Sequence, residues 1–127
     1  MGYHLSKISH RSFEDTIAAV TGALGDQGFG VLTEIDVRAT LGKKLGVEFR
    51  PYRILGACNP AFAHRALQLE DKVGTMLPCN VVVQQKGDQV EVSAVDPVAS
   101  MQAISNPALA EIAREVRDRL EKVLDAI

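Results

Sequence analysis

The chain of 127 residues has no tryptophan and few aromatic side chains of any kind, which together make up 5% of it. It therefore offers no row of rings on which the bases of a single-stranded nucleic acid could stack. An excess of positive charge is also missing, because 14 basic residues face 16 acidic ones and the formal net charge is −2. Such a chain has no global field that attracts a phosphate backbone. We expect no nucleic acid among its partners.

Long apolar runs are absent as well. The longest apolar stretch is centred on residues 81–83, whereas a membrane-spanning helix requires roughly 20 apolar residues. The chain does not open with a basic stretch followed by a long apolar run, so we expect no secretory signal. We predict a cytoplasmic protein with no membrane partner, in a compartment where thiols stay reduced.

Cysteine is scarce, since only Cys58 and Cys79 occur. Two cysteines are too few for the disulfide framework of a small secreted scaffold. They do not form a C-x-x-C pair, so thioredoxin-like and zinc-ribbon motifs are excluded. A glycine-rich phosphate loop, a G-x-S-x-G elbow and an H-E-x-x-H helix are missing too. What remains is the ordinary composition of a globular domain, with 46% hydrophobic and 24% charged residues.

The spacing of apolar residues predicts the order of strands and helices. We expect strands at residues 3–8, 29–35, 52–57, 77–85 and 90–95, and helices that start from caps at Ser12, Asp36, Asn59 and Asn106. The strand at 29–35 should be mostly buried, because apolar residues occupy both of its faces. This order predicts one α+β domain over residues 1–127, with an antiparallel sheet, two long helices on one face and a short helical insertion. One face of the sheet is left open, which predicts a homodimer.

The two cysteines stand in similar segments, G-A-C-N-P around Cys58 and L-P-C-N around Cys79. Cys58 is expected between a strand and the helix that begins at Asn59. The unpaired N–H groups at that helix start would lower the pKa of the thiol or attract an anion. Cys79 begins the next strand, so a compact sheet could bring the sulfurs together. The pattern predicts a redox pair, a soft-metal site or a carrier of sulfane sulfur; the alternative is that both cysteines are core residues.

A metal site would need more ligands than two cysteines, and sulfur ligands select copper(I) or zinc. Met76, His64 and Glu34 are the candidates to complete such a site. Glu34 falls in a strand rich in apolar residues, where a carboxylate needs a partner. It could act as a ligand, as a base or in a salt bridge with Arg53 or Lys44, and we favour the salt bridge.

These segments resemble the domain-of-unknown-function family 302 from about Tyr3 to Ile127. The resemblance is carried by residues 28–37, 44–46, 52–60, 66–67 and 77–83. Its most specific part is the pairing of I-L-G-A-C-N-P with L-P-C-N. It implies a β-α-β(4)-α fold similar to half of the TATA-binding protein, and it implies a homodimer. We carry over no DNA binding, because the chain is acidic and shows no pair of intercalating aromatic residues.

The family has no established activity, but its pattern includes Glu34, Cys58 and Cys79 together. We therefore predict a binding domain whose site contains these three residues with Asn59 and Asn80. A soft metal held by Cys58 and Cys79, or a small sulfur-containing or anionic ligand, would occupy it. Two alternatives stay open, a thiol-dependent enzyme or carrier in sulfur or redox metabolism, and a dimeric interaction module with no chemical site.

Overall fold

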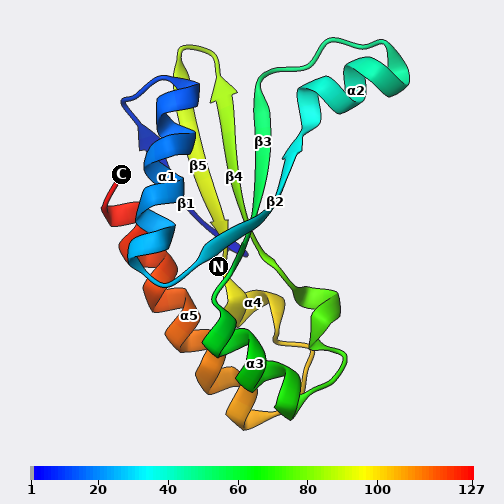
Figure 1. Cartoon of the computed structure of the whole chain (residues 1–127), viewed down its shortest axis with the longest axis vertical. Helices are drawn as coiled ribbons and strands as arrows, with labels where there is room; N and C mark the ends of the chain where they lie inside the picture. Colours follow the sequence, from blue (N-terminus) through cyan, green and yellow to red (C-terminus); the bar gives the residue numbers. More distant parts are fainter. Residues whose placement is uncertain (1) are drawn as a thin grey trace.

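A computed structural model describes residues 2–127 (Figure 1). The elements follow in the order β1 (His4–Ser9), α1 (Phe13–Asp26), β2 (Gly30–Asp36), α2 (Val37–Leu45), β3 (Tyr52–Cys58), α3 (Pro60–Leu69), the 3₁₀ helix η1 (Val73–Met76), β4 (Cys79–Lys86), β5 (Gln89–Val95), α4 (Pro97–Ser100) and α5 (Pro107–Asp125). The order expected from the sequence is confirmed. The short helices η1 and α4 were not predicted.

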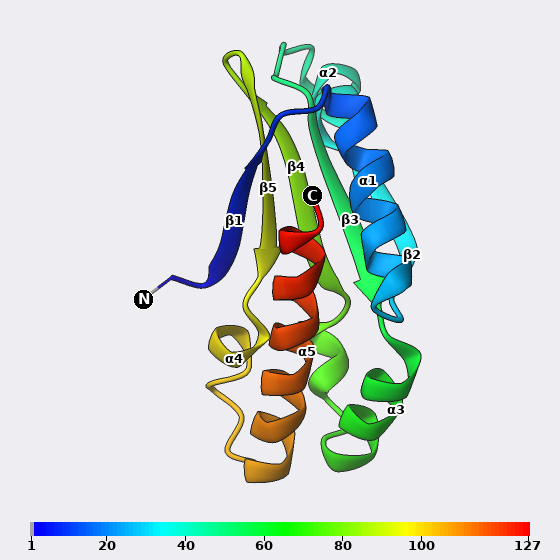
Figure 2. The same ribbon diagram turned by 90° about the vertical axis from the view of Figure 1, so that its left-hand side faces the viewer.

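The strands form one antiparallel sheet in the order β1-β5-β4-β3-β2. Figure 2 shows α1 and α5 lying side by side across one face of this sheet. The helix α2 is the predicted insertion between β2 and β3. Figure 1 shows it standing off on the other side of the sheet from α1 and α5. The predicted α+β architecture is therefore confirmed.

Side-chain caps fix the starts of several helices, as the sequence predicted. The Ser12 hydroxyl accepts a hydrogen bond of 3.2 Å from the backbone N–H of Asp15 and starts α1. The Asp36 carboxylate accepts one of 2.9 Å from the N–H of Ala39 and starts α2. Gly46, at φ 66°, ends α2 in the left-handed conformation that glycine adopts without strain.

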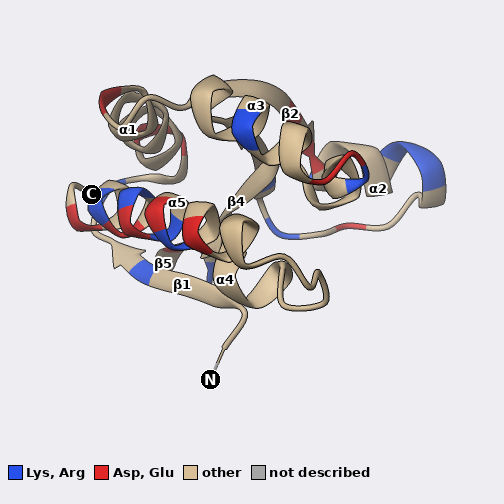
Figure 3. Ribbon diagram, turned by 90° about the horizontal axis from the view of Figure 1, so that it is seen from below, with Lys and Arg blue, Asp and Glu red and all other residues tan. Residues whose placement is uncertain are grey.

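Two hydrophobic clusters make up the core. The larger lies between the sheet and the pair α1 and α5, and the smaller joins α3, η1 and α5 beyond the end of the sheet. The larger includes Val20, Leu24, Leu55, Ala57, Cys79, Val81, Val83, Val92, Leu120 and Val123. The smaller contains Ala66, Val73, Met101, Leu109 and Ala113. Figure 3 shows acidic and basic residues along α5.

The strand β2 corrects one prediction, because it is mostly exposed rather than mostly buried. It is the last strand of the sheet, so β3 is its one strand neighbour. Leu32 keeps 69% and Ile35 47% of their surface exposed. Its ladder with β3 shifts register between Val31 and Thr33. The apolar residues on both faces of β2 thus do not mark a strand enclosed within the molecule.

Across residues 2–127, none of the helices has the combined length and apolar character that crossing a bilayer demands.

Candidate functional site

A small cavity lies where β3 passes into α3 and β4 begins. Its volume is about 30 Å³, and both Cys58 and Cys79 line it. Its walls include Phe29, Ile112 and Val116 of the larger cluster and Ala66, Met101 and Ala113 of the smaller one. The cavity therefore sits at the junction of the two clusters. No charged side chain belongs to its lining.

The two cysteines occupy different depths of this cavity, and both are free thiols. Only 7% of the surface of Cys79 is exposed, and the residue belongs to the larger core cluster. Cys58 is half-buried at the last position of β3. The register of the sheet explains their proximity, because Cys79 pairs with Ala57, the residue before Cys58. The expectation that the sheet brings both cysteines to one place is met.

Burial determines the protonation of the deeper thiol. Removal of Cys79 from water raises its pKa from 9.0 to about 11, and the neighbouring Cys58 adds to the increase. Cys79 is therefore a neutral thiol near pH 7, and its reactivity is low unless a ligand displaces its proton.

Asn59 holds the junction between β3 and α3 in an unexpected way. It occupies the predicted cap position, but its side chain does not cap α3. Instead its amide donates a hydrogen bond of 3.3 Å to the backbone oxygen of Gln27. The start of α3 is thereby tied to the end of α1, and the side chain is buried with 8% exposure.

A close approach of three residues shapes the wall next to Cys58. A Cβ atom at Gly56 would overlap the Thr33 hydroxyl oxygen and would lie 2.8 Å from Cγ of Pro78. Real Cβ atoms do not come this close to other atoms, so any larger residue here would force Thr33 and Pro78 to shift. Pro78 also lines the cavity. Gly56 thus lets the segment before β4 lie directly against β3.

Glu34 does not reach the cavity. Its carboxylate accepts a hydrogen bond of 2.7 Å from Arg53, which also lies 3.5 Å from Glu14 and 3.8 Å from Asp36. In the β2–β3 ladder Glu34 pairs with Leu55, whereas Cys58 pairs with Gly30. Those positions are separated by about 10 Å along the strand. The salt bridge that we favoured for Glu34 is present.

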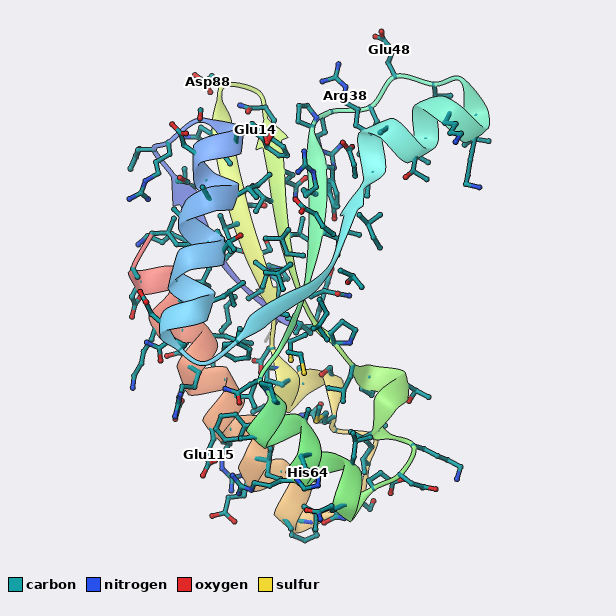
Figure 4. All side chains as sticks on the ribbon, in the orientation of Figure 1. Glu14, Arg38, Glu48, His64, Asp88 and Glu115 are labelled. Carbon is teal, nitrogen blue, oxygen red and sulfur yellow. The ribbon has the colours of Figure 1, made fainter. Side chains whose placement is uncertain are left out.

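Three other candidates also lie outside the cavity. Asn80 is exposed and lines a second, larger pocket of about 310 Å³ on the open face of the sheet, with Tyr52 and Val82. His64 is exposed on α3, where Figure 4 labels it at the end of the molecule away from Glu14. Met76 keeps 38% of its surface exposed and is not part of the lining.

Met101 is the site residue that the sequence did not indicate. It follows α4, is 9% exposed and lines the cavity with the two cysteines. It belongs to no motif, and nothing in its local sequence connects it with Cys58. Within residues 2–127, no three His, Cys, Asp or Glu side chains are grouped so that they could hold a metal ion.

Comparison with known proteins assigns the chain to a family. The sequence pattern of the family described as "Domain of unknown function DUF302" matches residues 5–127. The chain belongs to this family. The DUF302 assignment is supported by similarity to the crystal structure of an uncharacterized conserved DUF302 protein from Bacillus stearothermophilus. That protein is 33% identical, the match covers 99% of this chain and 98% of the other, and the TM-score is 0.94. The comparison with curated proteins finds no match.

Proposed function

We propose that this DUF302 protein binds a small soft-metal or sulfur-containing ligand in the cavity next to Cys58 and Cys79. One observation carries the proposal. Two cysteines with 20 residues between them in the sequence line the same cavity. The lining holds no charged side chain that could pair with a free anion, so we favour a ligand that bonds directly to the thiol sulfurs over the anionic ligand that the sequence left open.

The depth of the two thiols suggests how such a ligand enters. The half-buried residues Cys58, Phe62 and Leu77 form the outer part of the lining, and the buried Cys79 and Val116 form the inner part. A ligand would meet Cys58 first. About 30 Å³ accommodates one or two atoms the size of a water molecule. Any larger ligand would have to move the outer residues.

A thiol-exchange probe of the right size tests this proposal. Methyl methanethiosulfonate places a methylthio group on a thiol, as the thiolate sulfur attacks the reagent and methanesulfinate leaves. We expect one methylthio group on Cys58 of the folded chain, identified by intact and peptide mass spectrometry, and none on Cys79. A fluorescein maleimide, which is too large for the cavity, should react much more slowly.

The matched controls are Cys58→Ser, which should take up no methylthio group while folded, and Cys79→Ser, which should take up one. Should both thiols react only after denaturation, the cavity would be closed core and the proposed ligand site would be excluded.

We also propose that the chain forms a homodimer through the open face of the sheet. Ile35, Ile54 and Val82 are cross-strand neighbours. Ile54 and Val82 alternate with the buried Leu55 and Val81, so they lie on the face of the sheet away from the core. On the same side, α2 has no buried residue although Val37, Leu41 and Leu45 form an apolar stripe on it. Exposed apolar surface of this kind favours a protein partner, and the family resemblance implies a second copy.

Analytical ultracentrifugation tests the dimer. We expect twice the chain mass at micromolar concentration, and we expect Leu45→Asp to shift the chain to a monomer with an unchanged circular dichroism spectrum. Glu48→Gln on the following loop serves as an exposed control. A monomeric wild-type chain would overturn the proposal. A cytoplasmic location is part of the proposed function, since the site needs the reduced thiols that this compartment maintains.

A further inference from the structure

Most of the sulfur in the described chain is gathered around one cavity. Residues 2–127 contain four sulfur side chains, those of Cys58, Met76, Cys79 and Met101. Three of them, Cys58, Cys79 and Met101, line the cavity of about 30 Å³. They come from the end of β3, the start of β4 and the residue after α4. No acidic, imidazole or basic side chain accompanies them in the lining.

We propose that this cavity binds a single copper(I) ion, with Cys58 and Cys79 as thiolate ligands and Met101 as a thioether ligand. The inference rests on the proposed ligand site and names its occupant. Thiolate and thioether sulfur select copper(I) among the common metal ions. Copper(I) is also satisfied by two or three ligands, which is the number that this cavity offers.

The same donor set excludes the other common ions. Structural zinc takes four ligands, usually cysteine and histidine, and no suitable group of three His, Cys, Asp or Glu exists within the described residues. Calcium and magnesium require several oxygen ligands, and the lining offers no carboxylate. The volume also suits one ion better than a cluster, because it equals that of one or two waters.

One cationic side chain lies near such a complex. Coordination of one copper(I) by two thiols forms two sulfur–copper bonds, releases two protons to solvent and leaves a net charge of −1. The guanidinium groups of Arg65 and Arg119 lie 5.7 and 5.5 Å from the ring centre of Phe62, which lines the cavity. Arg65 is paired with Glu115 at 3.3 Å, so the positive charge on the far side of the Phe62 ring is that of Arg119. Apart from Asn59, the lining consists of apolar and sulfur-containing residues.

Anaerobic competition against the copper(I) chelator bicinchoninate tests the site. We expect the wild-type chain to take one copper(I) from the chelator. Cys58→Ser and Cys79→Ser should each lower the affinity by about 100-fold or more, and Met101→Leu by about tenfold. Met76→Leu is the matched control, because Met76 is exposed and lies outside the cavity. The copper(I) affinity of the Met76→Leu variant should equal that of the wild type.

Circular dichroism checks the fold of each variant, and Cys79→Ala replaces Cys79→Ser if the buried hydroxyl prevents folding. X-ray absorption on the copper-loaded chain should show three sulfur neighbours, and two for Met101→Leu. Oxygen or nitrogen neighbours, or equal losses from the two methionine variants, would overturn the proposal.

The copper assignment and the ligand site can fail separately. If Cys58 takes up the methylthio group but wild type binds copper(I) no better than the variant lacking both cysteines, the ligand site stands and copper is excluded as its occupant. If the methylthio group is not taken up and copper(I) is not retained, both proposals fall.

Discussion

Raising the pH above 9 should destabilise the fold through Cys79. Burial, with a smaller effect of Cys58, raises the pKa of this thiol from 9.0 to about 11. The unfolded chain therefore loses the proton at lower pH than the folded chain does. The stability that the neutral thiol contributes is complete below pH 9 and declines as the pH rises towards 11. The difference between the two pKa values corresponds to about 3 kcal/mol, of which about 2 kcal/mol is lost by pH 11.

Urea unfolding of the reduced chain in steps from about pH 8 to pH 11 measures this loss. The comparison is with Cys79→Ala, which cannot ionise at this position and so reports the pH dependence of all other groups. We expect the free energy of unfolding of the wild type to fall towards that of the variant as the pH rises. Cys58→Ala should keep most of the wild-type dependence, since burial is the main cause of the shift.

Parallel curves for the wild type and Cys79→Ala would refute this reasoning. They would mean that the Cys79 thiol ionises in the folded chain as readily as in the unfolded chain, and hence that water reaches the inner part of the cavity.

Two further substitutions test the packing and the charges around the site. Gly56→Ala should lower the free energy of unfolding by about 1–3 kcal/mol in urea titrations, because its Cβ would overlap the Thr33 side chain. Thr33→Ala in the same chain should restore part of the loss, and an additive double variant would contradict the contact. Arg53→Met should lower the free energy of unfolding by about 1 kcal/mol, since the partners of Arg53 are half exposed. Added salt should lower the free energy of unfolding of the wild type towards that of this variant. A difference that does not depend on salt would show that the ion pairs do not stabilise the fold.

The sequence predicted local features well because their causes are local. Ser12 and Asp36 start helices through bonds to residues three positions away, and Gly46 ends one through its own φ angle. The prediction that β2 is buried was wrong, because the burial of a strand depends on which strands lie beside it. An apolar strand at the end of a sheet has the same sequence character as one in the middle.

The candidate site was predictable only in part, for a similar reason. Cys58, Cys79 and Met101 meet because β3, β4 and the segment after α4 converge, and no periodicity encodes that convergence. The position of Asn80 could have been inferred, since successive residues of a strand point to opposite faces and Asn80 follows the buried Cys79. The single domain, the likeness to half of the TATA-binding protein and the homodimer stay predictions.

The register shift in β2 has a consequence for how the protein behaves at high concentration. An outermost strand presents unpaired N–H and C=O groups, which can template growth by strands of other molecules and lead to aggregation. Here the irregularity between Val31 and Thr33 interrupts the repeat of those groups, and the chain leaves the sheet for α2 after Asp36. Both features hinder the edge-to-edge pairing of sheets that leads to fibrils. The irregular β2 strand therefore protects this edge of the sheet against pairing with strands of other molecules.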